Sequence, residues 1–364
     1  MATICVVAFC VVLWIWFHRS LKYDIVEIQL PEGYTVGNGS YLVLKINDIG
    51  VVTGFMTSSI DSTCHVFKWE HDHGLSDLDN LGLGSFNFDI CDMNNNGQIL
   101  GSYFGKEILP EEIRKITRRE TMRHLFLYDP NQGVIQIESL NGWYNPHPIA
   151  MNEKGDFTGY YETVTPEGKL EQRIFFWNHT TGMQDPNMVG YPNDINESGH
   201  TVGVHQKEAF FWSPEAGPVN LGHLQNGPVY YCLINDLDEV VGIIGGPPSM
   251  TSKFFRWNPR KGFKLVRNIC DKKSYVVTMN KQGQLCYTTG DQHTLFGIQL
   301  QKRNENIVVN PGWGTTVLRT MFNSDDTDFS PLDMNNNGWI VGIVHDKVGQ
   351  RIFVLIPKNN PKPR

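Results

Sequence analysis

Short apolar runs alternate with polar turns along the whole chain, and one of these turns recurs seven times. Each copy places Ile or Met before an Asn, and in six copies a Gly follows three residues after the Asn. The seven asparagines are Asn47, Asn94, Asn152, Asn196, Asn235, Asn280 and Asn335. They lie 47, 58, 44, 39, 45 and 55 residues apart, a spacing typical of a repeated supersecondary unit. We number the units 1 to 7 after these residues.

Within each unit the pattern predicts four short strands. The Asn turn separates the first two apolar runs, and the second run carries another Gly, seven residues after the Asn, in every unit but the sixth. The third run is aromatic in units 1 to 5, as in Phe175-Phe176-Trp177, and a Gly five residues after its last aromatic residue predicts a second tight turn. We interpret the repeated Asn as a left-handed turn residue, because Asn tolerates positive φ. Asp238, which replaces Gly in unit 5, tolerates it too.

Seven units of four antiparallel strands predict an all-β fold, a seven-bladed β-propeller. Unit 7 ends at residues 355–357 without a fourth strand, whereas a spare strand-like run, residues 24–30, precedes unit 1. We therefore expect residues 24–30 to pair with residues 351–356 and close the ring, which removes exposed sheet edges. The Ile or Met before each Asn is expected to pack between neighbouring blades. The predicted propeller spans residues 23–358, between an N-terminal segment (1–22) and a C-terminal tail (359–364).

These motifs resemble the bacterial HAF-repeat proteins, a family named after a His-Ala-Phe run and described as extracellular repeat proteins. The run appears here as His65-Val66-Phe67 and His124-Leu125-Phe126. The resemblance covers about residues 41–356. It implies a propeller-like fold and export from the cell, and it implies no catalytic residue. We expect the two repeated histidines to be structural hydrogen-bonding groups rather than ligands.

The charge and cysteine content narrow the functional classes. The formal charge is −7 and no basic stripe is present, which argues against nucleic acid as a partner. The seven cysteines include no Cys-x-x-Cys pair, so we expect buried free thiols rather than a disulfide framework. A bridge between Cys270 and Cys286 stays open.

Residues 2–17 form an uncharged apolar run. No basic residue precedes it and no clear cleavage site follows it, so an uncleaved membrane anchor is favoured over a signal peptide. Arg19 and Lys22 would place the propeller on the cytoplasmic side, whereas the family resemblance implies export. The protein is therefore expected to be membrane-anchored or exported, with the side of the membrane left open.

Three turns begin like calcium loops, at Asp92, Asp194 and Asp333. No acid stands at the twelfth position of any of them, where an EF-hand places a bidentate Glu, so we interpret them as hairpin turns. The three aspartates would lie at one height near the axis, in blades that are not adjacent, with Lys45 between Asp333 and Asp92. We expect a solvated or ion-paired rim rather than a catalytic pair, and we predict no catalytic residue, metal or cofactor.

Two insertions break the period. Residues 110–123 suggest a short surface helix, with acids at its start and bases at its end. The candidate binding residues there are Arg114, Lys115, Arg118 and Arg119. Residues 299–331 are expected to form a long loop that carries Trp313, the other candidate.

The favoured function is a non-catalytic scaffold that binds a protein or a glycan through one rim and these insertions. The alternatives are a carbohydrate-binding protein or hydrolase that uses the axial funnel, and a calcium-stabilised adhesin.

Overall fold

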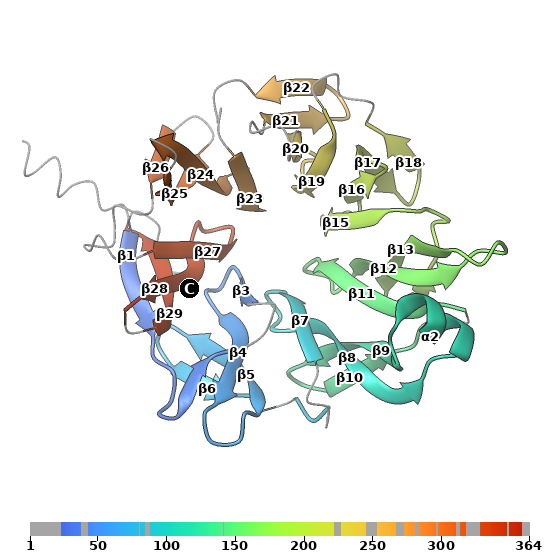
Figure 1. Ribbon diagram of the computed structural model, residues 1–364, viewed down its shortest axis with the longest axis horizontal. Coiled ribbons are helices and arrows are strands. Elements are labelled where there is room, and N and C mark those ends of the chain that lie inside the picture. The colour runs from blue at the N-terminus through green and yellow to red at the C-terminus, as the bar shows by residue number, and fades with distance from the viewer. Residues whose placement is uncertain are drawn as a thin grey trace, which may run out of the picture.

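The chain folds into antiparallel sheets arranged around a common axis like the blades of a propeller (Figure 1). The computed structural model describes residues 23–37, 43–79, 81–83, 88–140, 142–221, 227–244, 253–266, 273–280, 284–295, 298–310, 314–317, 328–347 and 349–358. Within these residues the strands form six four-stranded sheets and one sheet of five strands, and the single helix is α2 (Glu111–Thr117). The predicted all-β class and the predicted short helix are confirmed.

Each of the first four units forms one sheet from consecutive strands. Unit 1 contains β2 (Tyr34–Val36), β3 (Leu44–Ile46), β4 (Val52–Ser58), β5 (Cys64–Glu70) and β6 (Gly74–Asp77). Unit 2 contains β7 (Phe88–Met93), β8 (Ile99–Ile108), β9 (Thr121–Asp129) and β10 (Gly133–Ile137). Unit 3 contains β11 (Tyr144–Met151), β12 (Phe157–Val164), β13 (Leu170–Asn178) and β14 (Gly182–Gln184). Unit 4 contains β15 (Tyr191–Ile195), β16 (Thr201–His205), β17 (Glu208–Ser213) and β18 (Gly217–Asn220).

The last three units follow the same plan. Unit 5 contains β19 (Val229–Ile234), β20 (Val240–Ile244), β21 (Lys253–Asn258) and β22 (Gly262–Val266). Unit 6 contains β23 (Lys273–Met279), β24 (Leu285–Leu295), β25 (Ile298–Asn310) and β26 (Gly314–Val317). Unit 7 contains β27 (Asp328–Met334), β28 (Ile340–Asp346) and β29 (Gly349–Pro357), and β1 (Tyr23–Ile28) is its fourth strand.

The two ends of the chain meet in unit 7. β1 runs antiparallel to β29, with Tyr23 opposite Pro357 and Ile28 opposite Ile352. This is the predicted pairing of residues 24–30 with residues 351–356. An outer edge of β29 that would otherwise be unpaired is thereby covered by the start of the described chain.

The loop predicted for residues 299–331 is wrong. Residues 299–310 and 314–317 of that range belong to β25 and β26, which pair with each other, and β25 also pairs with β24 over a long hairpin. The aromatic signature of a third strand is missing there because Ile307 stands opposite Tyr287, where other units place Phe opposite Gly. Trp313 lies outside the described residues.

The second repeated Gly is explained by a close approach across the sheet. Gly159 lies directly opposite Phe175, and a Cβ at Gly159 would stand 2.5 Å from that ring and collide with the His147 carbonyl oxygen. The same pairing of Gly with Phe recurs in units 1, 2, 4 and 5. The Gly therefore makes room for the buried aromatic side chain of the third strand.

In six of the seven units the apolar residue before the Asn packs against the preceding unit, as predicted. Met151, for example, shares a core cluster with Leu100 and Leu125 of unit 2. The equivalent residues Ile46, Met93, Ile195, Ile234 and Met334 are at most 8% exposed. Through these contacts neighbouring sheets pack against one another around the axis.

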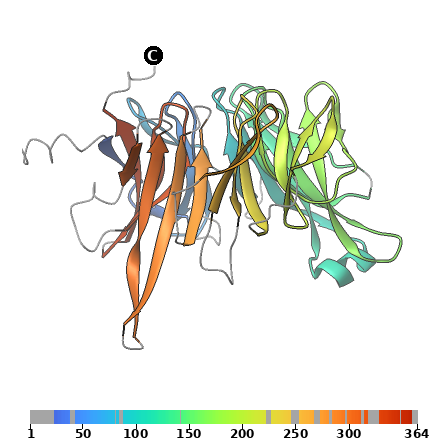
Figure 2. The same ribbon diagram turned by 90° about the horizontal axis from the view of Figure 1, so that it is seen from above.

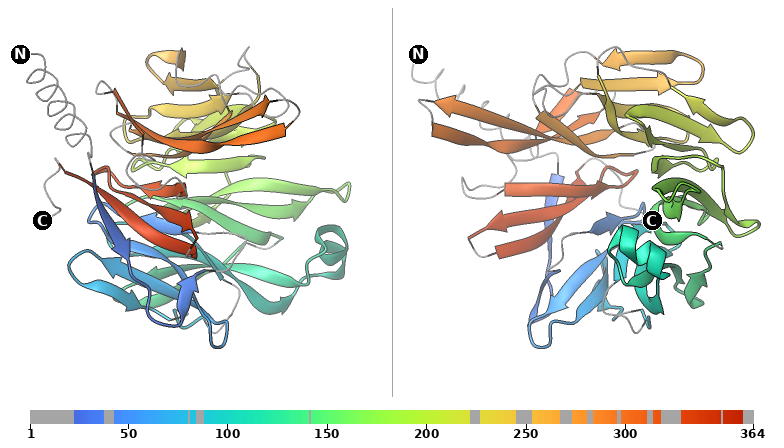
Figure 3. Two further views of the ribbon diagram at one scale, coloured as in Figure 1. Left: turned by 60° about the vertical axis from the view of Figure 1, so that its left-hand side comes forward. Right: turned by 45° about the vertical axis from the view of Figure 1, so that its right-hand side comes forward.

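The antiparallel order places the hairpins alternately at two ends of the ring. The Asn turns, between first and second strands, lie at one end together with the hairpins between third and fourth strands. We call this end the turn face. The hairpins between second and third strands lie at the other, the insertion face, from which α2 and the β24–β25 hairpin project (Figure 2 and Figure 3).

Several predictions concern residues that the structure does not describe. These are the N-terminal segment 1–22, the tail from residue 359 onward, and Cys270 of the possible bridge. In the part of the chain that is described, no helix is long and apolar enough to cross a membrane. Four cysteines there, Cys64, Cys91, Cys232 and Cys286, are free thiols.

Candidate functional site

The repeated Asn holds its turn through its side chain and not through a left-handed backbone. Positive φ belongs instead to the Gly three residues later, as at Gly50 (81°) and Gly199 (77°), and to Asp238 (58°) in unit 5. The Asn196 Oδ1 accepts hydrogen bonds from the backbone N–H groups of Ser198 and His200, both at 3.0 Å. The interpretation of the Asn as the left-handed residue is therefore wrong, whereas the substitution of Asp for Gly in unit 5 is explained as expected.

Five of these seven asparagines also link neighbouring units, whereas the side-chain N–H groups of Asn94 and Asn235 bond within their own turns. The Asn196 Nδ2 donates to the backbone carbonyl of Asn235 at 3.1 Å. Equivalent bonds run from Asn47 to Asn94, from Asn152 to Asn196, from Asn280 to Asn335 and from Asn335 to Asn47. All seven asparagines are at most 4% exposed. Because a buried amide is costly without hydrogen bonds, this Asn ring favours one spacing and register of the units.

A second set of bonds runs around the turn face, through the residue after each Asn. The Asp48 N–H donates to the Asn95 side chain, the Asn95 N–H to Glu153, and the Glu153 N–H to Glu197. The Glu197 N–H donates in turn to Asp236 at 3.1 Å. The acidic side chains of this series therefore act as acceptors for the backbone N–H groups of the preceding unit.

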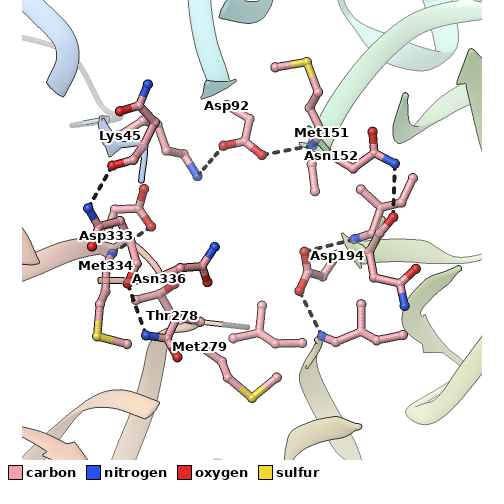
Figure 4. A pocket seen from close by; sticks show the side chains of 18 of the residues that line it. Lys45, Asp92, Met151, Asn152, Asp194, Thr278, Met279, Asp333, Met334 and Asn336 are labelled. Carbon is pink, nitrogen blue, oxygen red and sulfur yellow. Dashed lines mark hydrogen bonds and ion pairs between the residues drawn. The ribbon is translucent and has the colours of Figure 1, made fainter. Parts of the chain in front are cut away.

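The three aspartates predicted to lie near the axis also join neighbouring units, because each accepts hydrogen bonds from backbone N–H groups of two units (Figure 4). The two oxygens of Asp194 accept from the N–H groups of Ile195 and Ile234, both at 2.9 Å. Asp92 binds the N–H groups of Met93 and Met151, and Asp333 binds those of Met334 and Ile46. These carboxylates line a cavity of about 220 Å³ inside the channel, which we call the turn-face cavity.

Lys45 lies between Asp333 and Asp92, as the sequence predicted. Its ammonium group is 3.6 Å from Asp92. Burial alone would lower the pKa of Lys45, but Asp92 and Asp333 outweigh it and hold that pKa above its usual value. The rim is therefore ion-paired, and it lies inside the channel rather than in open solvent.

Burial raises the pKa of two of these aspartates. It raises the pKa of Asp194 to about 7, although the two backbone hydrogen bonds oppose the shift. Burial also raises the pKa of Asp333, partly offset by Lys45. A carboxyl that titrates near neutrality can be a general acid or base, but both oxygens of Asp194 are already bound to the backbone. No group of three or more potential metal ligands occurs among the described residues.

A different kind of hollow opens toward the insertion face. It has a volume of about 490 Å³, and we call it the insertion-face pocket. Its polar wall comes from Asp89, Ser102, Arg123, His147 and Tyr160 of units 2 and 3. Its apolar wall comes from Val43, Leu44, Ile90, Ile149 and Leu332 of units 1, 2, 3 and 7. Lys45 lines both this pocket and the turn-face cavity.

Arg123 is the cationic centre of this pocket. Its Nη1 donates to Asp89 at 2.9 Å and to Ser102 at 2.8 Å, and its guanidinium lies 4.4 Å above the centre of the Phe104 ring. Its side chain is 13% exposed. The guanidinium is thus held in one orientation by side chains of β7 and β8.

Aromatic side chains continue the wall of the pocket beside Arg123. His147 stacks on Tyr160 with ring centres 4.7 Å apart, and Tyr160 meets Tyr191 edge to face at 5.2 Å. Burial, reinforced by Arg123 and Arg119, lowers the pKa of His147 to about 3, and its Nε2 has no hydrogen-bond partner. His147 is therefore neutral at physiological pH.

The pocket was not predicted, although one signal in the sequence points to it. The residues five positions before the repeated Asn include Asp89, His147, Tyr191 and Tyr230. Tyr191 and Tyr230 are 45% and 46% exposed. A half-exposed aromatic residue at a repeat-equivalent position marks the mouth of the channel at the insertion face.

The four basic candidates on the insertion have different roles. Arg119 forms a double hydrogen bond, at 2.9 and 3.0 Å, with Glu162 of unit 3, a carboxylate that is only 3% exposed. Arg114 binds the Leu109 carbonyl and Glu120, and Lys115 pairs with Glu111. Arg118 ends the helix with a left-handed backbone and is exposed. Arg119 therefore fastens the insertion to unit 3, whereas Lys115 and Arg118 face solvent.

The repeated histidines have the structural role that was expected. His65 lies 2.9 Å from Asp77 and 3.0 Å from Thr63, and His124 lies 3.0 Å from Glu107. Both histidines lie on the third strand of their sheet, and these contacts stay within one unit.

Comparison with known proteins identifies the fold. No protein family matches the sequence, and no curated protein is similar to it. Among solved structures, streptogramin B lyase matches with a TM-score of 0.51 at 9% identity, over 92% of this chain and 99% of that one. A puromycin hydrolase matches with a TM-score of 0.51 at 9% identity, over 85% of this chain and 50% of that one.

A structure of two prolyl endopeptidases gives a TM-score of 0.50 at 8% identity, over 88% of this chain and 48% of the chain compared. The chain thus spans nearly the whole lyase but only about half of the puromycin hydrolase chain and of the prolyl endopeptidase chain. At such identities the similarity supports a propeller fold and carries no activity over to this chain.

Proposed function

We propose that the protein is a seven-bladed β-propeller that acts as a non-catalytic binding scaffold, attached to a membrane or exported through its apolar N-terminal segment. Its partner, a protein, binds on the insertion face. The HAF-repeat resemblance and the uncharged run 2–17 support the envelope location, and fractionation of cells that express the chain with and without residues 1–22 tests it.

The observation that carries this proposal is the contrast between the two ends of the channel. At the turn face, Asp92, Asp194 and Asp333 are each hydrogen-bonded to the backbone of two units, so they serve the ring rather than a substrate. At the insertion face, a pocket of about 490 Å³ opens beside a projecting helix with exposed basic side chains. Loops and inserted segments on a rigid scaffold are the usual place for binding residues.

A second candidate is a carbohydrate-binding protein. The observation that favours it is the pair of half-exposed tyrosines, Tyr191 and Tyr230, at equivalent positions of units 4 and 5. Exposed aromatic rings beside polar groups can stack on sugar rings. This candidate uses the same face and needs no catalytic residue.

The test is affinity capture on the full chain, followed by identification of the retained molecules. Removal of the whole insertion would leave Glu162 buried without Arg119, so exposed side chains are replaced instead. One variant combines Lys115→Ala with Arg118→Ala, and another combines Tyr191→Ser with Tyr230→Ser. The matched control combines Lys154→Ala with Arg260→Ala, which removes two exposed charges from the turn face.

We expect the unchanged chain and the control to capture the same protein. The variant that combines Lys115→Ala with Arg118→Ala should capture at least tenfold less of it. Glycans on an array that bind the chain and are lost with the tyrosine variant would favour the second candidate. A partner that only the turn-face control loses would refute binding at the insertion face.

A further inference from the structure

We infer that the insertion-face pocket binds a carboxylate attached to an apolar body, as presented by the C-terminal residue of a peptide chain or by a small aliphatic acid. This inference rests on the proposed function, because it names the chemistry of the partner that the insertion face receives. The geometry of Arg123 and the composition of the two pocket walls carry it.

Arg123 has donors left for a ligand. A guanidinium carries five N–H donors, and Nη1 uses its two for Asp89 and Ser102. No described residue accepts from Nε or Nη2, which form the edge that binds a carboxylate with two parallel hydrogen bonds. Because Asp89, Ser102 and Phe104 hold the group in place, little side-chain entropy is lost when a ligand binds.

The apolar residues that line the pocket provide the complement to Arg123. Val43, Ile90, Ile149 and Leu332 converge on the pocket from four different units. A volume of about 490 Å³ lies in the range of ordinary small-ligand pockets. A carboxylate on Arg123 would thus place a branched aliphatic side chain against these residues, which favours Leu, Ile or Val as the terminal residue.

The groups beside Arg123 suit an anion. The imidazole of His147 is neutral, so it neither adds a charge nor competes for the ligand carboxylate. Asp89, the nearest acid, is bound to Nη1 and orients the guanidinium from the other side. Lys45 at the base of the pocket is paired with Asp92. Arg123 is therefore the cationic group of the pocket whose donors remain for an anion, beside the neutral imidazole of His147.

The test is calorimetric titration of the full chain with three probes. These are acetyl-Ala-Ala-Leu with a free carboxylate, the same peptide as an amide, and 4-methylpentanoate. We expect saturable binding of the acid and at least tenfold weaker binding of the amide. Comparable binding of 4-methylpentanoate assigns the site to small acids, whereas binding of the peptide acid alone assigns it to a chain terminus.

Two variants locate the site. Arg123→Gln should weaken binding of the acid at least tenfold. Arg351→Gln is the matched control, because Arg351 also pairs with a carboxylate, Glu27, and lies over a Phe ring, but on the outer strands of unit 7. It should leave binding unchanged.

Equal binding of acid and amide, or no binding of either at millimolar concentration, would overturn the inference. That comparison uses the unchanged chain, so it holds even where Arg123→Gln fails to fold. If a captured protein partner still depends on Lys115 and Arg118 in that case, the proposed scaffold function stands and only the carboxylate chemistry fails.

Discussion

The two ends of the central channel contain similar residues and use them in opposite ways. At the turn face, asparagines and aspartates are repeated around the ring, and their side chains bind the backbone of the next unit. At the insertion face, Arg123 and His147 each occur in one unit only, and they retain hydrogen-bonding atoms without a partner among the described residues. Repetition thus accompanies a structural role, and departure from the repeat accompanies the candidate binding site.

This difference shows why conspicuous acids can mislead. The turn-face cavity is lined by seven Asp or Glu side chains, which would suggest a cation site or a catalytic funnel. Hydrogen bonds from backbone N–H groups explain these carboxylates, since each one joins two units of the ring. The insertion-face pocket is less acidic, but Arg123 in it keeps N–H donors for a ligand.

The largest effect is expected at the Asn ring. Asn196→Ala removes two bonds inside its turn and two to unit 5, through the Asn235 carbonyl and Asp238, so we expect a loss of about 3 kcal/mol in the free energy of unfolding. Urea denaturation measures it. Tyr230→Ala, at the half-exposed rim of the insertion face, should cost less than about 1 kcal/mol.

The variant Asn196→Asp sharpens this test. It keeps the acceptor for the turn but sets a carboxylate oxygen against the oxygens of Asn235 and Asp238, which Nδ2 now binds. If Asn196→Asp proves as stable as the unchanged chain, the link between units contributes nothing, and the contrast between the two faces is weaker than stated.

A smaller effect is expected from Arg119, the basic candidate that pairs with a buried carboxylate. Arg119→Ala leaves Glu162 with Asn145 as its remaining described partner, and we expect a loss of about 2 kcal/mol. Lys115→Ala removes a pair whose side chains are 72% and 71% exposed and should cost less than about 0.5 kcal/mol. Adding Glu162→Gln to Arg119→Ala should restore part of the loss, and equal urea midpoints for the two alanine variants would contradict the assignment of Arg119 as a fastener.

Local and repeated features of the fold could be predicted from the sequence. The spacing of Asn and Gly located both hairpin turns of units 1 to 5, and the spare run before unit 1 indicated the pairing of β1 with β29. In unit 6 the prediction was wrong, because Ile307 replaces the aromatic residue that identifies the third strand elsewhere.

The candidate site was harder to predict than the fold. The insertion-face pocket draws residues from four units, between Val43 and Leu332, so no local motif contains it. The pairing of Arg119 with Glu162 joins residues 43 positions apart, and charge counting alone made Arg119 look available to a partner. The side-chain role of the repeated Asn was missed because its link to the next unit exists only in the closed ring.

The smallest effect concerns the pH dependence of the turn face. Burial raises the pKa of Asp194 to about 7 from a usual value of 3.8, so the folded state keeps a proton that the unfolded state has lost. The contribution of this group to stability is therefore fully present below about pH 4 and falls as the pH rises toward 7. We expect the difference to be on the order of 1 kcal/mol, because the carboxyl still touches the water-accessible cavity. Urea denaturation between these pH values measures it. Asp194→Asn should flatten the slope, the exposed Asp72→Asn should not, and identical slopes in all three proteins would mean that Asp194 is ionised in the fold like a surface carboxylate.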